Sequence, residues 1–301
     1  MPGLTRQRAE SLRPLLERFF AQTKWHERIG YDPVEFPRRY RDPRDVEVSA
    51  LLSASLAYGR ADLFRPKLET LHRAMGPSPA AFVRALDVPG AKTLLDGFVY
   101  RFNVGTDVAA LLLGMGRVLR EQGSLEAPFV EGMRAEGVSE VRAGLTALTT
   151  ELRRLPMTEL RRAMGPERGL EHLVPSKQGA GAAKRLNLFL RWVVRGPDEV
   201  DLGVWKRVPA SALVIPLDTH VMRMAHNLGL TTRNDVSWRT AEEVTASLRL
   251  LDPDDPVRFD FPLCHWGMSG ACPAEPKATN CEACALLATC RVGPKVVKRA
   301  R

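Results

Sequence analysis

The chain has 301 residues, of which 45% are hydrophobic and 26% charged, the balance of a folded globular protein rather than a disordered or fibrous one. Lysine and arginine number 44 against 35 aspartates and glutamates, and the net charge of +9 favours polyanionic partners such as nucleic acid. No apolar run approaches the roughly 18 residues of a membrane span, and the charged first residues do not form a secretion signal. We therefore expect a cytoplasmic protein with no membrane partner, built as two domains or as one large domain with two lobes.

Apolar residues recur at helical spacing along most of the chain. The first amphipathic segment covers 11–24, and Asp45 is placed to cap a second, which is followed by a helix over 61–75. Further helical periodicities, separated by glycine, proline or polar clusters, cover 107–121, 138–155, 182–195, 219–228 and 240–250. Because strand patterns are almost absent, the sequence predicts an all-α fold. The basic tail 295–301 shows no apolar face, and we expect it to be mobile.

Four of the five cysteines cluster near the end of the chain, at Cys272, Cys281, Cys284 and Cys290. In a reducing compartment such clustering indicates metal binding rather than disulfides. Four thiolates can hold a zinc ion or a [4Fe-4S] cluster, and because only one pair of cysteines is close in sequence, the spacing favours the iron–sulfur cluster. Cys264 stands apart from them and is interpreted as a small buried apolar residue.

Three segments of the chain resemble the helix-hairpin-helix DNA glycosylases, in the branch of endonuclease III and adenine glycosylase. The cysteine loop 272–290, with Cys-His-Trp-Gly at 264–267 before it, resembles the family's C-terminal iron–sulfur loop, with one longer spacer. The segment 216–221, Pro-Leu-Asp-Thr-His-Val, is similar to the family's Val-Asp-Thr-His segment, which implies that Asp218 is the catalytic carboxylate. The segment 49–55 resembles the family's Leu-Leu-Ser-Ala-Gln helix end, whose last residue reaches into DNA.

The resemblance implies a two-lobed helix-hairpin-helix fold with a C-terminal iron–sulfur cluster loop. One domain is expected over 41–212, with a helical insert at about 122–169 and a hairpin-like DNA-binding element at about 174–195. The second lobe would comprise 1–40 and 213–301 and carry the loop 272–290. More closely still, the chain resembles an uncharacterised bacterial family within this superfamily, and that resemblance names no substrate.

The hairpin segment also suggests a nucleophile. Bifunctional members of the family use a hairpin lysine to form a Schiff base with the sugar, and the candidates here are Lys184 and Lys177. Without either lysine the enzyme would be monofunctional. On its predicted helix, Lys184 lies opposite the apolar stripe with Arg191 and Arg195, where a solvated basic face is the alternative interpretation. Asp218 likewise precedes a helix, where it can act as an N-cap.

The expected DNA contacts combine the wedge region with the glycine-rich hairpin, whose backbone can approach a phosphate. Ser55 stands where the family has glutamine, and because serine is short, Tyr58 and Arg60 are alternative wedges. The full set of expected contacts is Ser55, Tyr58, Arg60, Lys177, Gln178, Gly179, Gly181 and Arg185.

We therefore expect a monomeric, nucleoid-associated DNA repair glycosylase that extrudes a damaged or mispaired base from double-stranded DNA. Hydrolysis of the N-glycosidic bond would involve Asp218, with or without an AP-lyase step. Two alternatives stay open: a non-catalytic protein that binds damaged or branched DNA, in which Asp218 is only a helix cap, and a zinc-stabilised helical RNA-binding module. The sequence does not identify the base.

Overall fold

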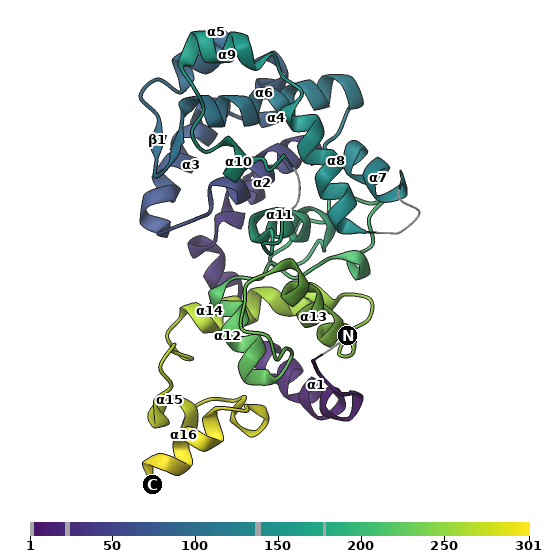
Figure 1. The fold of residues 1–301 in the computed structure, drawn as a ribbon, viewed down its shortest axis with the longest axis vertical. Helices are drawn as coiled ribbons and strands as arrows, with labels where there is room; N and C mark the ends of the chain where they lie inside the picture. Colours follow the sequence, from purple (N-terminus) through teal and green to yellow (C-terminus); the bar gives the residue numbers. More distant parts are fainter. Residues whose placement is uncertain (1–2, 22–24, 136–139, 177–178) are drawn as a thin grey trace. The chain divides into compact units, whose positions relative to one another are not determined.

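The structure is a computed structural model that describes residues 3–21, 25–135, 140–176 and 179–301. The fold is mostly helical, as the periodicities predict, and divides into two compact units (Figure 1). Unit 1 comprises Met1–Arg28, Ala180–Arg191 and Pro209–Arg301, and unit 2 comprises Ile29–Gly179 and Trp192–Val208. The sequence placed the whole hairpin-like element, about 174–195, in the 41–212 domain. In the structure, Ala180–Arg191 of that element belong to unit 1, and the described residues on either side of them belong to unit 2.

Unit 2 is built from helices and one two-stranded β-hairpin, in which β1 (Val99–Tyr100) pairs antiparallel with β2 (Asn103–Val104). Its helices are α2 (Pro43–Leu56), α3 (Ala61–Met75), α4 (Pro79–Ala85), α5 (Val88–Leu94), α6 (Gly105–Gln122), α7 (Glu126–Ala135), α8 (Val141–Arg153), α9 (Met157–Met164) and α10 (Leu170–Leu173). Three short 3-10 helices precede them: η1 (Trp25–Tyr31), which begins in unit 1, η2 (Pro33–Glu35) and η3 (Pro37–Arg39).

Helix α6 is the centre of unit 2, since α4, α5, α8, α9 and α10 all pack against it. Two glycines on α6 permit the close packing. A Cβ at Gly116 would overlap the carbonyl oxygen of Val83 in α4, and a Cβ at Gly114 would overlap that of Leu152 in α8. Helices α8 and α9, which lie within the expected insert at about 122–169, pack directly on α6.

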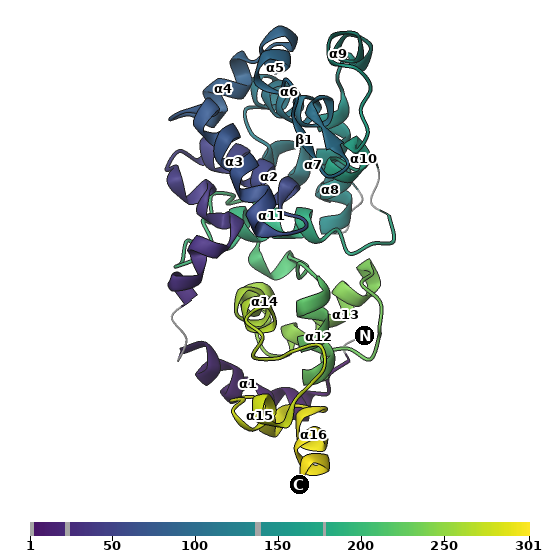
Figure 2. The ribbon, with the colours of Figure 1, turned by 90° about the vertical axis from the view of Figure 1, so that its left-hand side faces the viewer.

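Unit 1 gathers helices from three parts of the chain. They are α1 (Arg6–Ala21), the first eight residues of α11 (Lys184–Val194), α12 (Thr219–Leu228), α13 (Trp238–Arg249), α14 (Asp260–Met268), α15 (Ala278–Glu282) and α16 (Gly293–Ala300). Its 3-10 helices are η4 (Ala210–Ala212), η5 (Pro256–Phe259) and η6 (Leu287–Thr289). Helices α12 and α14 pack against each other (Figures 1 and 2). The edge of the Phe19 ring contacts Trp266, with 4.8 Å between the ring centres.

Two local expectations were wrong. The tail 295–301 is not mobile coil but forms most of α16, because Val297 supplies a buried contact that the pattern did not reveal. The N-cap of α2 is Asp42 rather than Asp45, whose carboxylate instead accepts hydrogen bonds from the Ser78 hydroxyl (2.7 Å) and the Ala80 amide (2.8 Å).

The helices predicted over 61–75 and 219–228 are confirmed at both ends. None of the helices in the described ranges has the length and apolar character that a membrane crossing requires.

Candidate active site

Asp218 lies immediately before α12 and caps it, as predicted. Its Oδ1 accepts hydrogen bonds from the backbone amides of His220 and Val221, both at 2.9 Å. An aspartate at this position satisfies amides that the helix itself leaves without partners, and its charge is favourable at the positive end of the helix dipole. The other carboxylate oxygen, Oδ2, faces side chains from two further helices.

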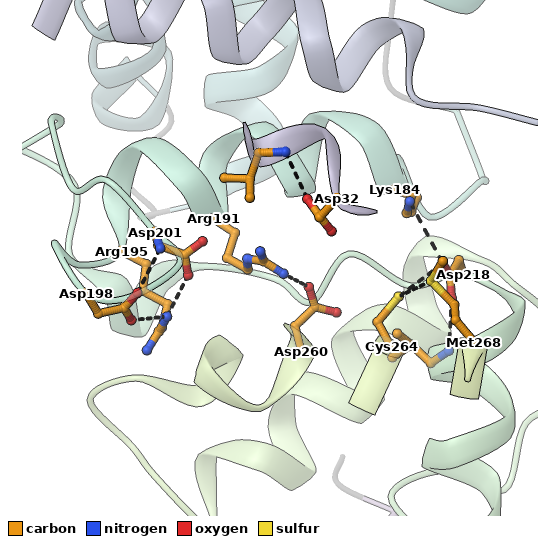
Figure 3. A network of polar contacts seen from close by, with 12 residues as sticks. Asp32, Lys184, Arg191, Arg195, Asp198, Asp201, Asp218, Asp260, Cys264 and Met268 are labelled. Carbon is orange, nitrogen blue, oxygen red and sulfur yellow. Dashed lines mark hydrogen bonds and ion pairs between the residues drawn. The ribbon is translucent and has the colours of Figure 1, made fainter. Parts of the chain in front are cut away.

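Lys184 is the first residue of α11, and its Nζ lies 3.8 Å from Oδ2 of Asp218 (Figure 3). The lysine and aspartate side chains are 32% and 22% exposed, so both remain accessible to a ligand. The two sequence candidates for catalysis, which stand 34 positions apart in the chain, are thus brought into one site within unit 1. A lysine amine beside a carboxylate is an arrangement in which the carboxylate can accept a proton as the amine attacks.

Cys264 is the third group at this carboxylate, and sequence reasoning missed it. It is half-buried on α14, and its thiol lies 3.7 Å from Oδ2 of Asp218 and 3.7 Å from Sδ of Met268 (Figure 3). The interpretation of Cys264 as a buried apolar residue was therefore wrong. The sequence did hold a signal for this placement, because Cys264 stands one helical turn after Asp260. Side chains at this spacing share one face of a helix, so the thiol lies on the same face as an acidic residue.

Arg191 and Asp260 form a buried ion pair between α11 and α14. Their side chains are 2% and 3% exposed, and Nη1 of Arg191 donates to Oδ2 of Asp260. Burial raises the pKa of Asp260 to about 6, with Arg191 opposing the effect and the negative charge of Asp218 adding to it. Arg191 therefore does not belong to a solvated basic face. Arg195 pairs with Asp198 (2.6 Å) and Asp201 (2.5 Å) in unit 2.

The ion pair and the Asp218 site lie on the same two helices. Lys184 and Arg191 are two turns apart on α11, roughly 10 Å along its axis, and Asp260 and Cys264 are one turn apart on α14. The Arg191–Asp260 contact therefore holds α11 against α14 in a register that brings Lys184 and Cys264 to the same carboxylate oxygen.

The four clustered cysteines of unit 1 line one small pocket of about 30 Å³. None of them forms a disulfide. The sulfur of Cys272 accepts a hydrogen bond from Nδ2 of Asn227 at 3.4 Å, and that of Cys290 accepts one from the amide of Gly293 at 3.2 Å. Burial and the neighbouring thiols raise the pKa values of the Cys281 and Cys284 thiols. As arranged, no three cysteine, histidine or acidic side chains in the described part of the chain form a set that could hold a metal ion.

The expected wedge residues of unit 2 are engaged in internal contacts. Ser55 is buried within α2, at 2% exposure, and presents no surface to a ligand. The Tyr58 hydroxyl donates to the carbonyl of Tyr100 at 3.0 Å and also contacts the side chain of Asn103. Arg60 precedes α3 with its side chain 77% exposed and forms an ion pair with Asp62 at 2.6 Å.

The residues of the expected hairpin-like DNA-binding element, at about 174–195, differ in their surroundings. A Cβ at Gly179 or at Gly181 would meet nothing within 4 Å, so the packing of the chain does not require glycine at either position. Gly181 pairs with Ser237 in an isolated antiparallel bridge. Arg185 is the second residue of α11 and is half-buried. Lys177 and Gln178 lie outside the described residues.

The turn between β1 and β2 is a further feature that the sequence did not suggest. Phe102 is 44% exposed there, and Arg101 has a left-handed backbone with φ of 53°. The Arg101 guanidinium lies over the ring of Tyr58, 5.8 Å from its centre, and Phe102 stacks on that ring at 5.3 Å. The run Tyr-Arg-Phe at 100–102 is the sequence signal that could have revealed this feature, since it places an aromatic and a basic side chain at the tip of a short turn.

A comparison with protein families matches residues 32–269 to the model described as "Protein of unknown function (DUF2400)". The match includes Lys184, Asp218 and Cys264, and the four clustered cysteines lie beyond it. A search of the curated proteins gave no match. Because the family model covers most of its length, the chain belongs to the DUF2400 family.

Proposed function

We propose that this protein is a DNA glycosylase that releases a damaged or mispaired base, with Asp218 and Lys184 at its reaction centre. The observation that carries the proposal is the 3.8 Å approach of the lysine amine to the carboxylate. Cleavage of a bond between a sugar and a base passes through an oxocarbenium-like state, which a nearby carboxylate stabilises. The resemblance to the helix-hairpin-helix glycosylases singles out the same aspartate on independent grounds.

In the bifunctional reaction, the Lys184 nitrogen attacks C1′ of the deoxyribose while the bond from C1′ to the base breaks. The departing base takes a proton from solvent or from a donor in the site, and Asp218 accepts the proton that the lysine nitrogen loses. In the monofunctional reaction, Asp218 activates water for the same displacement. Both reactions need the carboxylate, and only the first needs the amine.

Charge and backbone features support duplex DNA as the partner. The net charge of +9 favours a polyanion. Gly179 and Gly181 precede α11 and are not required by internal packing, whereas a glycine backbone allows close approach to a phosphate. Arg60 and Arg185 add basic side chains, and the exposed Phe102 offers a ring that could stack on a base.

We also propose that Cys272, Cys281, Cys284 and Cys290 hold a [4Fe-4S] cluster, with zinc as the alternative. The support is that all four thiols line one pocket and none is disulfide-bonded. Gly293 borders the same pocket, where a Cβ would lie 3.5 Å from the sulfur of Cys290 and 3.6 Å from that of Cys281. Bound there, a cluster would crosslink the segment 272–290 through all four of its cysteines.

The experiment is mass spectrometry of duplex oligonucleotides that carry oxidised, alkylated, deaminated, mispaired or abasic sites. Wild type is compared with Asp218→Asn and Lys184→Gln, and with Asp254→Asn and Lys206→Gln as exposed controls of matching charge. Base loss with wild type and both controls, but not with Asp218→Asn, supports the proposal. Lys184→Gln then separates the two reactions, because it removes borohydride trapping on abasic DNA only if this amine forms the Schiff base. Binding of lesion DNA without any base loss favours the non-catalytic binder.

A further inference from the structure

The Asp218 carboxylate is held by donors on both of its oxygens. Oδ1 accepts hydrogen bonds from two backbone amides of α12 at 2.9 Å. Oδ2 forms an ion pair with Lys184 of α11 and accepts a hydrogen bond from the Cys264 thiol of α14. Three elements of unit 1 thus meet at one side chain, as Figure 3 shows for the two side-chain donors. The amides fix one oxygen to the helix end, so the orientation of the other depends on the side chains that face it.

Helix packing fixes the position of the thiol. Cys264 stands one turn after Asp260, whose buried ion pair with Arg191 holds α14 against α11. Leu263, its neighbour in sequence, is fully buried, so α14 cannot rotate about its axis without exposing apolar surface. The sulfur is therefore held near Oδ2 by the fold of unit 1 rather than by the contact alone.

We infer that Cys264 is a positioning residue, whose thiol binds Oδ2 of Asp218 and keeps the carboxylate directed at the amine of Lys184. Its importance for catalysis rests on the proposed function, but the contact itself can be tested without a substrate. A thiol is a weak donor, so it restrains the oxygen while leaving it able to accept a proton. An arginine or a second lysine at this position would instead hold the carboxylate ionised and compete with Lys184 for it.

The decisive test is the rate at which iodoacetamide alkylates Cys264 in the full-length protein, followed by mass spectrometry of the peptide that contains it. The thiolate is the reactive form, and a neighbouring carboxylate charge disfavours it. Asp218→Asn, which retains the ability to cap α12, should therefore accelerate alkylation about fivefold. Lys184→Gln, which removes the positive charge, should slow it. Asp254→Asn, the matched control on an exposed aspartate of unit 1, should leave the rate at the wild-type value.

Equal rates in wild type and Asp218→Asn would overturn the inference, because the thiol would then not sense the carboxylate. Repeating the measurement with a duplex that contains a tetrahydrofuran abasic analogue separates this inference from the proposed function. Protection of Cys264 by the duplex supports both. A rate that responds to Asp218→Asn but not to the duplex supports the thiol contact and counts against a DNA site here.

The effect on turnover is tested with Cys264→Ser and Cys264→Ala on a duplex from which wild type releases a base. Serine keeps a hydrogen-bond donor and alanine does not, so kcat should fall in the alanine variant and recover in the serine variant, with KM unchanged in both. Equal losses of kcat in the two variants would mean that the sulfur serves packing only and would overturn the positioning role.

Discussion

Single residues of this protein combine a structural and a proposed chemical role, and Asp218 is the clearest case. One carboxylate oxygen caps α12, while the other faces Lys184 and Cys264. A helix cap is rigid because its partners are backbone atoms, so the same contacts that stabilise α12 also fix Oδ1 of the carboxylate in the site.

The two roles of Asp218 can be separated by mutation. Asp218→Asn should abolish base release but leave thermal stability nearly unchanged, because asparagine caps helices about as well as aspartate. Asp218→Ala should in addition lower the free energy of unfolding by about 1 kcal/mol. Urea unfolding and base release, measured on the same preparations, check both statements. Full activity in Asp218→Asn would exclude a catalytic role for the carboxylate.

Arg191 and Asp260 depend on each other because both are almost completely buried. Asp260→Ala should lower the free energy of unfolding by about 3–5 kcal/mol, since it leaves the Arg191 charge buried beside an empty volume. Asp254→Ala, on an exposed aspartate, is the control and should change it by less than about 0.5 kcal/mol. Denaturant titration measures both. If Asp260→Ala lowered the free energy of unfolding by no more than Asp254→Ala does, the ion pair would not hold α11 against α14.

At the scale of helices, the sequence predicted most elements but not their contacts. The bounds of α3 and α12 follow from apolar spacing closed by a glycine after the last turn. Helix α16 escaped prediction because its sequence is dominated by basic residues and its single buried side chain gives no periodicity. The cap of α2 was assigned three residues late because two aspartates, at 42 and 45, both fit the pattern.

The candidate site was predictable only in part, for the same reason. Asp218 and Lys184 were each found from the resemblance of a local segment, the Asp-Thr-His segment and the hairpin segment, to the glycosylase family. Their approach depends on how α11 and α14 lie with respect to each other, and the buried Arg191–Asp260 ion pair that links the two helices has no local signature. Cys264 was misread because its exposure depends on the same packing rather than on its apolar neighbours in sequence.

The loop that carries the four cysteines offers a prediction at this scale. Cys284→Ser should remove the visible absorbance of the purified protein if the four thiols hold an iron–sulfur cluster, because a serine hydroxyl is a poor ligand for it. The yield of folded protein should fall as well, since the loop would lose its crosslink. Cys264→Ser is the matched control and should keep the absorbance. A colourless wild type that contains zinc would assign the site to the alternative metal.

Taken as a whole, the molecule contains two buried groups, one in each unit, whose protonation affects stability in opposite directions. In unit 2, burial lowers the pKa of His72 to about 4, although its ring contacts the hydroxyl of Ser49 and the carbonyl of Leu68. In unit 1, burial raises the pKa of Asp260 to about 6. Protons therefore bind preferentially to the unfolded form at His72 and to the folded form at Asp260.

Protonation of these two groups should accordingly change local stability in opposite directions. The stability that neutral His72 contributes is complete above pH 6.5 and is lost as the pH falls toward 4, by on the order of 2 kcal/mol at pH 5. The stability gained by protonating Asp260 is absent at pH 7 and grows as the pH falls through 6. Hydrogen exchange at pH 7 and pH 5, corrected for the intrinsic rate, should show α3 losing protection while α14 keeps or gains it.

Two variants identify the groups responsible for this pH dependence. His72→Gln should abolish the loss of protection in α3, and Asp260→Asn should abolish the gain in α14, because neither replacement titrates in this range. A loss of protection in α3 that persists in His72→Gln would assign the pH dependence of unit 2 to other groups.

The two glycines of α6 constrain how this protein can change over evolutionary time. At Gly114 and Gly116 the backbones of α8 and α4 occupy the volume that any larger residue would need. Even alanine there would push one helix outward and open a gap along its whole length. Sequence drift in unit 2 should thus be tolerated on the outer surfaces of its helices and blocked at these two positions. The Gly-x-Gly pair in the middle of α6 therefore marks where two neighbouring helices approach it, which its hydrophobic pattern does not reveal.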